Sequence, residues 1–507
     1  PGHAVTICGP GGMGKTALAA EVIWQLAPAS DPLQLFPDGI VFHTFYHKPQ
    51  PELALEAIAR AYGEDPRQNP LDAAKRALAG RRALIVLDGA EACEDLQTVL
   101  SVTGSCGVLI TTRHRGDAPE EASDLLPLPE DKAVELLRAW GGSMATDEGT
   151  CRSICSLLGR LPLAIHLAGR YLSHRRQMAS DYLAWLEETP LEALDLGKRQ
   201  HQSIPLLMEH SLEHVSEQAR CCLGLAGVLA MRPFEAEVIA IALQVSVQKA
   251  NFSLGELVDY GLLTRPDACY QISHALAHTY ARKRIAVQND VLARLAQHYN
   301  KFSSELRELG LSGYSLLDAH RDHILAVQSA CNRAGLLTEA QAIVWAIEDY
   351  LDLQGHSAER ISVVQAGLQA ARSDGNRSDE ASFLNLLGNA YATLGDARKA
   401  IEYYEQQLAI AREIGDRRGE GNALGNLGNA YVTLGNARKA IEYYEQAQVI
   451  SRKIGNRRGE GNRLGNLGSA FYNLGDIYKA QDYYQQQLEI AQEIGDRNGE
   501  ANALWGQ

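Results

Sequence analysis

Eight residues near the start of the chain have the types and spacing of a phosphate-binding loop. They match the pattern G-x-x-x-x-G-K-[ST] and read Gly9, Pro10, Gly11, Gly12, Met13, Gly14, Lys15 and Thr16. Glycines let backbone N–H groups converge on phosphate oxygens, while Lys15 can reach the β and γ phosphates and the Thr16 hydroxyl can bind Mg²⁺. The pattern predicts a site for ATP or ADP with Mg²⁺, extending from Gly9 to Ala17. A glycine turn without a ligand is the alternative.

Three further side chains can complete the chemistry of such a site. Asp88 follows an apolar run, the arrangement in which a Walker B carboxylate holds Mg²⁺. Glu91 can polarise an attacking water, or it can be a solvated carboxylate at a helix cap. Arg113 follows another apolar run and can contact the γ-phosphate, or it can form a surface ion pair. We therefore expect Lys15, Asp88, Glu91 and Arg113 to be the catalytic residues.

Apolar runs and helical stretches alternate around these residues. We expect strands at 4–8, 39–45, 83–88 and 108–112, and helices at 17–26, 51–62 and 70–80. Near-continuous apolar strands that alternate with helices are typical of a parallel sheet covered on both faces. The first region is thus predicted to be α/β and doubly wound, with Asp88 and Arg113 at the carboxyl edge of the sheet, where ligands bind.

The composition excludes several classes of protein. The 507 residues carry a formal net charge of −14, which argues against direct nucleic-acid binding or an anionic membrane surface. No apolar run approaches the length of a membrane helix, and we expect a cytoplasmic protein. The nine cysteines lack the spacing of a zinc motif, so we expect buried, reduced thiols.

A resemblance to a known family emerges from the order of the motifs. The phosphate loop, the Asp88 strand, the end of the 108–112 strand and the stretch Gly159-Arg160-Leu161-Pro162-Leu163-Ala164 occur in that order. Together they resemble the NB-ARC type of STAND P-loop ATPase, a family that includes apoptosis-activating factors, plant resistance proteins and many bacterial regulators. The resemblance implies that Pro162 packs near the nucleotide. Because Gly89 replaces the second acidic residue that the family often has, we expect slow hydrolysis.

The resemblance also implies a winged-helix domain whose histidine contacts the β-phosphate of ADP. His274 occupies that position, although the family's flanking Met and Asp are Ser273 and Ala275 here. A winged helix can read DNA. The candidate recognition helix, 253–260, carries Glu256 and Asp259 but no basic residue, so we expect it to pack within the chain.

The last third of the chain repeats itself every forty residues. The sequence LGNAY at 387–391 recurs at 427–431 and becomes LGSAF at 467–471, and each copy precedes an A-x-x-x-aromatic pattern. These features match the tetratricopeptide repeat (TPR), whose usual period is about 34 residues, with Arg452 in place of the terminal proline. We expect the extra residues to lengthen the second helix and its loop.

A TPR array has a concave face that binds peptides or proteins. We expect a set of small polar side chains to line it: Asn389, Asn422, Asn429, Asn462 and Ser469. Alternatively, these side chains bond to one another or to water.

Five regions are expected in the chain. They are a nucleotide-binding domain at 1–130, a helical ARC-like subdomain at 131–212, a winged-helix domain at 213–290, a helical bridge with a degenerate repeat at 291–378, and TPR repeats at 379–507. The fold class is thus multidomain α/β plus α, ending in an α-solenoid.

The family resemblance implies an ADP/ATP signal-transduction switch, with slow ATPase turnover acting as a timer. Partner binding by the repeats would favour the ATP form, which would self-associate and activate an N-terminal effector outside this fragment, for example in bacterial defence. Two alternatives are a transcription regulator of the same ATPase family and a TPR scaffold whose nucleotide site is structural.

Overall fold

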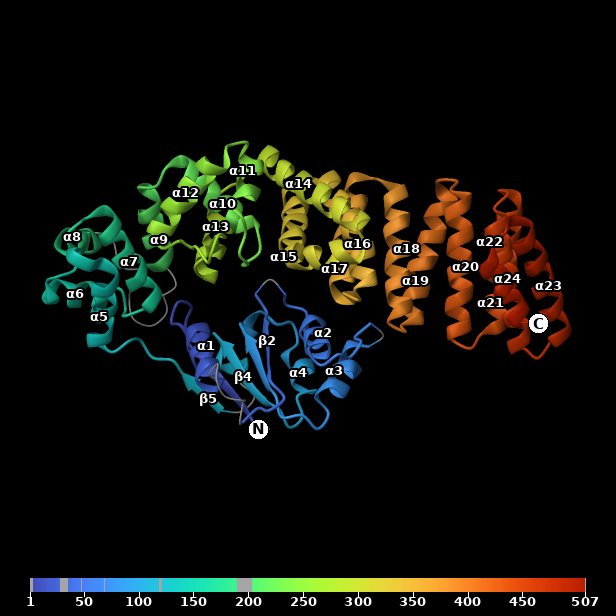
Figure 1. The fold of residues 1–507 in the computed structure, drawn as a ribbon, viewed down its shortest axis with the longest axis horizontal. Helices are drawn as coiled ribbons and strands as arrows, with labels where there is room; N and C mark the ends of the chain where they lie inside the picture. Colours follow the sequence, from blue (N-terminus) through green and yellow to red (C-terminus); the bar gives the residue numbers. More distant parts are fainter. Residues whose placement is uncertain are drawn as a thin grey trace. The chain divides into compact units, whose positions relative to one another are not determined.

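The computed structural model describes residues 3–27, 35–46, 48–67, 69–117, 121–188 and 203–506 (Figure 1). These residues form two compact units that divide between Glu339 and Ala340, with Arg67 and Asn69 grouped with the second unit. None of the described helices combines the length and the apolar composition that a bilayer crossing needs.

A five-stranded parallel sheet forms the core of the first region. Its strands are β1 (Ala4–Cys8), β2 (Ile40–Thr44), β3 (Leu84–Asp88), β4 (Gly107–Thr112) and β5 (Glu121–Asp124). They lie in the order β2-β3-β4-β1-β5, and every neighbouring pair is parallel. The four strands expected from the sequence are confirmed. The fifth was not expected, because the sequence EASD has no apolar run.

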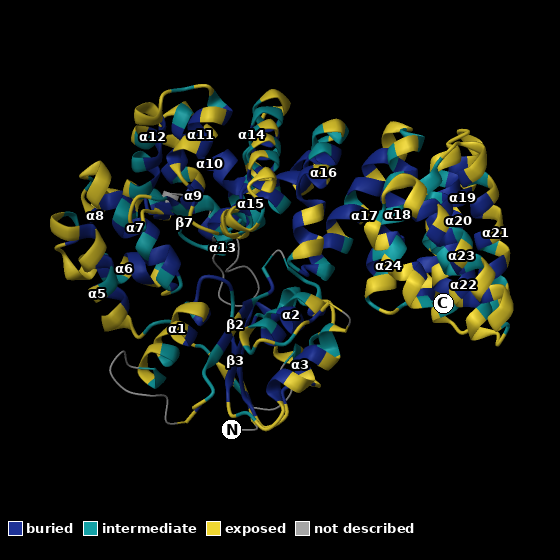
Figure 2. Ribbon diagram, turned by 45° about the vertical axis from the view of Figure 1, so that its right-hand side comes forward, coloured by how far each residue is buried: buried dark blue, intermediate teal, exposed yellow. Residues whose placement is uncertain are grey.

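Helices cover both faces of this sheet, as Figure 1 shows. On one face, α1 (Lys15–Leu26) packs its Ala19 with Ile7, Val86 and Leu109. The other face packs against α2 (Pro51–Ala61), α3 (Pro70–Leu78) and α4 (Leu96–Leu100). The central strands β3 and β4 are buried along their whole length between these layers (Figure 2), so the expected doubly wound α/β fold is confirmed.

A group of helices follows the sheet. Its members are α5 (Glu130–Gly141), α6 (Glu148–Leu157), α7 (Pro162–Arg175), α8 (Ala179–Glu188) and α9 (Ser203–Glu213). Pro162 occupies the first turn of α7, where its missing N–H costs no hydrogen bond. Asp147 caps α6 by accepting a hydrogen bond from the backbone N–H of Thr150.

The next elements have the order expected for a winged helix. They are α10 (Glu217–Val228), α11 (Ala236–Leu243), α12 (Val247–Asp259), the antiparallel pair β6 (Leu263–Thr264) and β7 (Gln271–Ile272), and α13 (Ala275–Arg284). The acidic residues of α12 have partners inside this unit. Glu256 accepts hydrogen bonds from the backbone N–H and the hydroxyl of Ser216, both at 2.7 Å. Oδ1 of Asp259 lies 3.9 Å from Nη2 of Arg170.

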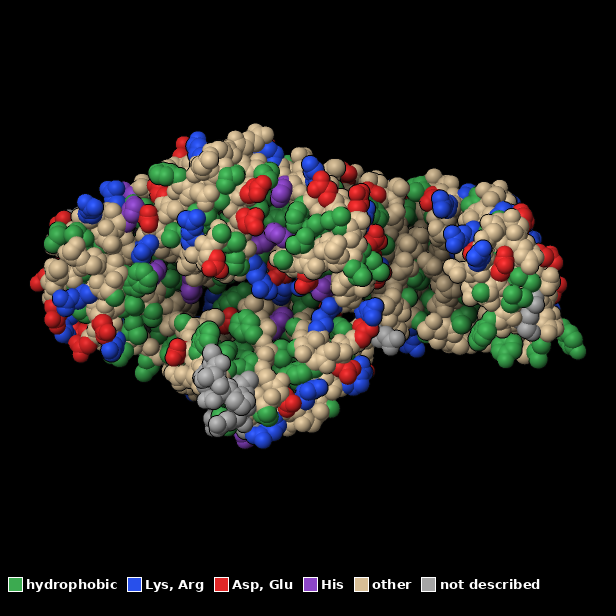
Figure 3. Space-filling model, in the orientation of Figure 1, with side chains coloured by type: hydrophobic (Ala, Val, Ile, Leu, Met, Phe, Trp, Pro, Cys, Tyr) green, Lys and Arg blue, Asp and Glu red, His purple; other side chains and the backbone are tan. Residues whose placement is uncertain are grey.

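The unit ends with α14 (Asn289–Glu308) and α15 (Leu311–Ala334). Over the face drawn in Figure 3, basic and acidic side chains are interspersed, without a broad basic area. The intramolecular partners of Glu256 and Asp259 agree with the expectation that α12 packs within the chain.

Helix hairpins make up the remainder of the chain. They are built from α16 (Leu337–Leu353), α17 (Ser357–Asp374), α18 (Arg377–Thr393), α19 (Ala397–Glu413), α20 (Arg417–Thr433), α21 (Ala437–Lys453), α22 (Arg457–Asn473), α23 (Ile477–Ile494) and α24 (Arg497–Gly506). Both α20 and α21 have 17 residues. The expected lengthening of the second helix and its loop is therefore wrong, because the helices are equal and the loops, 434–436 and 454–456, are short.

Close packing between the helices of a hairpin depends on glycine. A Cβ added to Gly428 in α20 would lie 2.3 Å from the ring of Tyr444 in α21. Only a residue without a side chain allows the ring to lie flat against the helix at this point. Leu424 and Leu427 of the same helix are buried in a cluster with Ala400 and Tyr404 of α19.

An ion cluster recurs in successive repeats. Glu420, which is 5% exposed, accepts hydrogen bonds from Nε of Arg412 at 2.9 Å and from Nη1 of Arg417 at 2.7 Å. The equivalent clusters are Arg372–Glu380–Arg377 and Arg452–Glu460–Arg457. Arg452, at the position expected for the terminal proline, thus joins the end of one hairpin to the start of the next.

Candidate functional site

The phosphate loop connects β1 to α1 at the carboxyl edge of the sheet. Gly12 and Gly14 have φ angles of 82° and 89°, in the left-handed region that favours glycine. Gly14 is followed directly by Lys15, the first residue of α1, so the loop ends at a helix N-terminus. Free N–H groups and the helix dipole at this end attract anions.

Lys15 lies inside the loop. Its side chain is 6% exposed, and Nζ donates hydrogen bonds to the carbonyl oxygens of Gly9 at 2.7 Å and Pro10 at 3.0 Å. Burial lowers the pKa of Lys15, and the charge of Arg113 adds to the effect against the opposing carboxylates Glu91 and Asp88. A buried ammonium group held by neutral carbonyls is a favourable partner for an anion.

Thr16 and Asp88, the expected Mg²⁺ ligands, are in direct contact. Oγ1 of Thr16 donates a hydrogen bond to Oδ1 of Asp88 at 2.8 Å. Thr111 in β4 donates to the same oxygen at 2.7 Å and accepts from the backbone N–H of Gly89 at 3.0 Å, which fixes the carboxylate. A hydroxyl and a carboxylate oxygen suit the preference of Mg²⁺ for oxygen ligands, so these residues fit the ion.

Glu91 and Arg113 hold each other beside the loop. Nε of Arg113 lies 2.8 Å from Oε1 of Glu91, and the backbone N–H of Arg113 donates to Oε2 at 3.1 Å. In this arrangement Glu91 is 10% exposed and Arg113 is 31% exposed, so the pair is partly enclosed. The alternative of an ion pair at Arg113 therefore matches the structure, whereas a helix cap at Glu91 does not, since Gly89 is the N-cap residue.

Tyr46 is a site residue that the sequence did not reveal. Its hydroxyl donates to Oε1 of Glu91 at 3.4 Å, and its ring packs on Gly89, where an added Cβ would lie 2.9 Å away. Burial, together with the charges of Glu91 and Asp88, raises the pKa of Tyr46 to about 12. Tyr46 follows β2, and a single tyrosine after a strand carries no motif that could have marked it.

Two helices of the following region touch the loop from outside the sheet. The backbone N–H of Leu163, next to Pro162 in α7, donates to the carbonyl oxygen of Gly12 at 3.3 Å. A Cβ added to Gly12 would also lie 2.7 Å from Cδ1 of Ile204 in α9. Pro162 therefore directly precedes, in the chain, the residue that bonds to Gly12. No sequence motif indicated that Ile204 contacts the loop.

His274 lies at the start of α13, and it too is near the loop. Its Nδ1 accepts a hydrogen bond from the backbone N–H of Leu276 at 3.0 Å, which caps the helix. Burial lowers the pKa of His274 to about 4, and the charges of Lys15 and Arg113 contribute. A neutral ring that accepts at Nδ1 carries its hydrogen on Nε2, so Nε2 is a donor. The side chain of Leu276 lies 3.2 Å from the position of a Cβ on Gly11.

A cavity opens beside these residues. Its volume is about 590 Å³, within the range of small-molecule sites. The lining residues are Cys8, Gly9, Pro10, Glu91, Arg113, His114, Arg115, Asp124 and Leu276. Arg115 and Asp124 form an ion pair of 2.5 Å at this wall. The structure thus brings the loop, Thr16 with Asp88, Arg113 with Glu91, and the start of α13 to one edge of the sheet, and their roles there stay predictions.

The polar side chains expected to line the repeat groove fall into two groups. Oδ1 of Asn429 accepts a hydrogen bond from the Tyr444 hydroxyl at 2.8 Å, and the same contact recurs between Asn389 and Tyr404 at 2.8 Å and between Ser469 and Tyr484 at 3.0 Å. Each of these three side chains thus bonds to a tyrosine of its own repeat, a partner that neither the groove expectation nor its alternative named, and their contact with a bound partner stays a prediction. Asn422 and Asn462 are exposed, and their contact with a partner stays a prediction.

Comparison with family models identifies the repeats. A model of the tetratricopeptide repeat matches residues 379–453, and a second model with the same description matches residues 462–494. The C-terminal repeats are therefore tetratricopeptide repeats, as the sequence predicted.

Comparison with curated proteins finds relatives that are named as regulators, among them two AfsR proteins. The regulatory protein AfsR of Streptomyces coelicolor is 28% identical over an alignment of 293 residues, and the match covers 54% of this chain and 29% of that protein. The regulatory protein AfsR of Streptomyces griseus is 25% identical over an alignment of 436 residues, and the match covers 77% of this chain and 44% of that protein. The matched part thus spans less than half the length of either relative.

Among solved structures, one similar chain is a STAND protein with a tetratricopeptide repeat sensor, PH0952 from Pyrococcus horikoshii. It is 16% identical, with a TM-score of 0.39 over 99% of this chain and 82% of that chain.

Proposed function

We propose that this chain is a nucleotide-dependent signalling switch of the NB-ARC-type STAND class. The observation that carries the proposal is that three elements outside the sheet, α7, α9 and α13, touch the phosphate loop through Leu163, Ile204 and Leu276. A loop in contact with several elements can transmit the state of its ligand to them, because a change at the loop alters their packing. The regulatory role named for the two AfsR relatives supports this class of function.

In the proposed switch, Lys15 and the loop N–H groups bind the phosphates. Thr16 and Asp88 hold Mg²⁺, which bridges phosphate oxygens and neutralises their charge. Nε2 of His274 donates a hydrogen bond to the β-phosphate of ADP, which ties α13 to the nucleotide in the closed form. Pro162 and Leu163 hold the start of α7 against the loop.

Arg113 distinguishes the triphosphate in this proposal. Its guanidinium is held by Glu91, and a γ-phosphate competes with that carboxylate for it. Because Glu91 is engaged and Gly89 replaces a second acidic residue, hydrolysis is slow and works as a timer.

The repeats supply the signal. A protein or peptide bound to their concave face can shift the switch only through a higher affinity for the open form. ATP then replaces ADP, and the opened chains self-associate to activate an effector in the complete protein. Such an effector can serve bacterial defence. A second candidate is a transcription regulator of the same ATPase class, because other relatives of this chain are named putative HTH-type transcriptional regulators.

The first test is to denature the purified chain and identify any released nucleotide by chromatography. Lys15→Ala is compared with Lys132→Ala, which removes an exposed lysine far from the loop in sequence. We expect ADP from the parent and from Lys132→Ala, and none from Lys15→Ala. If nothing is released, ADP and ATP are titrated into the chain by calorimetry. Equal nucleotide binding by Lys15→Ala and the parent would overturn the site, and a parent that binds neither nucleotide would leave the TPR scaffold as the function.

A further inference from the structure

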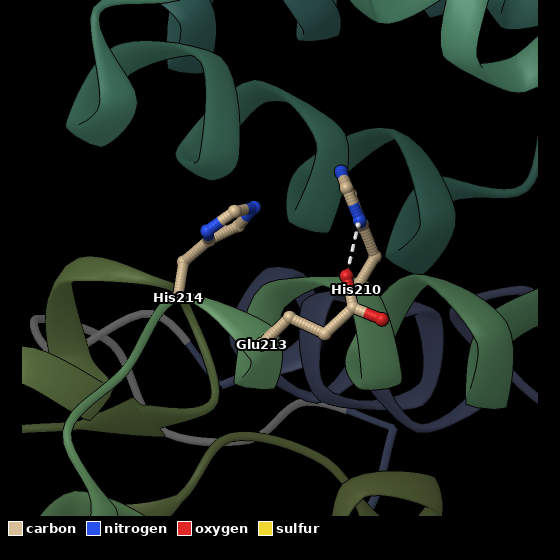
Figure 4. A group of neighbouring side chains, drawn as sticks. All are labelled: His210, Glu213 and His214. Atoms are coloured by element: carbon tan, nitrogen blue, oxygen red, sulfur yellow. Dashed lines mark hydrogen bonds and ion pairs between the residues drawn. The ribbon is translucent and has the colours of Figure 1, made fainter.

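The last turn of α9 and the residue that follows it bring together three side chains that can bind a metal ion. His210, Glu213 and His214 each offer a ligand atom, and these atoms all lie within 4.8 Å of one another (Figure 4). Within the parts of the chain that the structure describes, no other group of three or more His, Cys, Asp or Glu side chains has this geometry. The group of His210, Glu213 and His214 shares no residue with the proposed nucleotide site.

The spacing follows from the helix. Residues four apart are neighbours on one face, so the two imidazoles lie one turn apart with the carboxylate beside them. Figure 4 shows the Glu213 carboxylate turned toward His210, and Nδ1 of His210 lies 3.3 Å from Oε2 of Glu213. Two ligands at about 2.0–2.1 Å from a tetrahedral zinc ion lie about 3.4 Å apart. One edge of the required tetrahedron is therefore already formed.

Aromatic rings fix one ligand while the others can adjust. The His210 ring stacks on Trp185 with centroids 3.7 Å apart and on Tyr171 at 4.7 Å. Its side chain is 13% exposed, whereas that of Glu213 is 62% exposed. Because the His210 ring is already held in place, only the exposed side chains would have to rotate for all three residues to bind one ion.

The charges around the group are compatible with a cation. Burial lowers the pKa of both histidines, which favours the neutral imidazole that binds metals. Arg175 lies near enough to lower these pKa values further, so it opposes a cation, but Glu213 supplies a negative charge directly at the group.

We propose that His210, Glu213 and His214 bind one zinc-type divalent cation, with water in the remaining position. Two imidazoles and a carboxylate suit Zn²⁺, and also Co²⁺ or Ni²⁺, better than Mg²⁺ or Ca²⁺, which prefer oxygen ligands alone. The site lies just before Ser216, the N-cap residue of α10, and α9 carries Ile204 against the phosphate loop. A bound cation therefore stiffens the connection between α9 and α10, and this site does not depend on the proposed nucleotide switch.

The test uses the whole chain without an affinity tag, after treatment with a chelator. ZnCl₂ is titrated by calorimetry, CoCl₂ by visible absorption, and unfolding temperatures are compared with and without ZnCl₂. We expect one ion per chain, cobalt bands typical of four-coordinate nitrogen and oxygen ligands, and a higher unfolding temperature with zinc. No stoichiometric zinc binding would overturn the proposal. So would a thiolate-to-cobalt absorption band on the bound ion, because the nine cysteines would then be the ligands.

Variants separate the site from other histidines. His214→Asn and Glu213→Gln alter accessible side chains and leave the stacked His210 ring in place. We expect each to weaken zinc binding at least tenfold. His174→Asn, on the neighbouring α7, is the matched control and should bind as the parent does. Unchanged affinity in His214→Asn, with circular dichroism equal to that of the parent, would overturn the assignment.

Discussion

Asp322 in α15 forms an ion pair with Lys48, which follows β2, although 274 residues separate them in the sequence. Nζ of Lys48 lies 2.6 Å from Oδ1 of Asp322, whose side chain is 12% exposed. The other oxygen of Asp322 lies 3.0 Å from Nε of Arg232, between α10 and α11. Burial acts to raise the pKa of Asp322, but Lys48 and the nearby arginines lower it to about 2. One carboxylate of α15 thus joins the segment after β2 to the loop between α10 and α11 in the same unit.

Replacing this carboxylate should weaken the attachment of the segment after β2 to α15. We expect Asp322→Asn to lower the free energy of unfolding by about 1–3 kcal/mol, because Lys48 loses a largely buried partner. If the chain is the proposed switch, a fluorescent ADP analogue should also leave several-fold faster. Asp318→Asn, at an exposed position on the same helix, is the control. Equal unfolding curves for Asp322→Asn and the parent would show that the pair contributes nothing.

The two roles of His274 can be separated by two substitutions. His274→Ala removes both the helix cap and the donor, whereas His274→Asn keeps an oxygen that can accept from the backbone of Leu276. We expect both variants to release ADP about tenfold faster, since a hydrogen bond to a charged group contributes about 1.5–3 kcal/mol. Only His274→Ala should also lower the unfolding temperature of the nucleotide-free chain. Parent-like ADP retention in His274→Asn would contradict a phosphate contact.

The pair of Arg113 and Glu91 should control the preference for ATP over ADP. Glu91→Gln weakens the hold on the guanidinium, so Arg113 becomes more available to a γ-phosphate. We expect the ratio of ATP to ADP affinity, measured by calorimetry, to rise in Glu91→Gln and to fall in Arg113→Ala. If the ratio is the same in the parent and both variants, Arg113 does not read the γ-phosphate.

Acidification should destabilise the first unit through buried histidines. Nδ1 of His323 accepts from the backbone N–H of Ala230 at 3.2 Å, Nε2 contacts the carbonyl oxygen of Pro233 at 3.1 Å, and burial lowers the pKa of the ring to about 4. In the unfolded chain the pKa is about 6.5, so between these values the unfolded state binds more protons. Stability is therefore fully present above about pH 6.5 and falls toward pH 4.

The measurement is denaturant unfolding at pH 7, 6 and 5. His323 alone should contribute a loss of about 1 kcal/mol for each pH unit in this range. His323→Asn should show a correspondingly smaller slope, even if it is less stable at pH 7. An equal slope in the two proteins would mean that His323 does not titrate in this way.

A glycine pair tests the packing of the repeats. We expect Gly428→Ala to destabilise the second unit by about 1–3 kcal/mol, because the new methyl group overlaps the Tyr444 ring. Gly255→Ala, in α12, meets no atom within 4 Å and should instead be neutral or stabilising by up to about 1 kcal/mol. Thermal unfolding followed by circular dichroism distinguishes the two. Parent-like stability in Gly428→Ala would show that the hairpin can widen without cost.

Local patterns predicted the parts of the site that lie close in sequence or at strand ends. The order strand, glycine loop and helix located Lys15 and Thr16, and the end of an apolar strand placed Asp88 at the same edge of the sheet. The repeats could also be predicted, since similar residues recur every forty positions in the sequence itself. These features depend on short-range geometry and on the side-chain periods of helices and strands.

Other parts of the site depend on packing between distant segments. Ile204 and Leu276 touch the loop, but an apolar residue in a helix carries no sign of which surface it meets. Glu91 and Arg113 were each assigned a separate role, and the ion pair became apparent only from their positions. The strand β5 escaped notice because its four polar or small residues pair with β1 through the backbone alone.

The near identity of the repeats has a consequence for how this chain can change over generations. Residues 397–406 and 437–446 have the same ten-residue sequence, ARKAIEYYEQ. Gene segments that encode such similar sequences can misalign during recombination. A crossover between two misaligned copies then adds or removes one complete forty-residue repeat. Each added copy brings its own Arg–Glu–Arg cluster and the same interface to its neighbours. The number of repeats can therefore vary between descendants without any change to the residues around the phosphate loop.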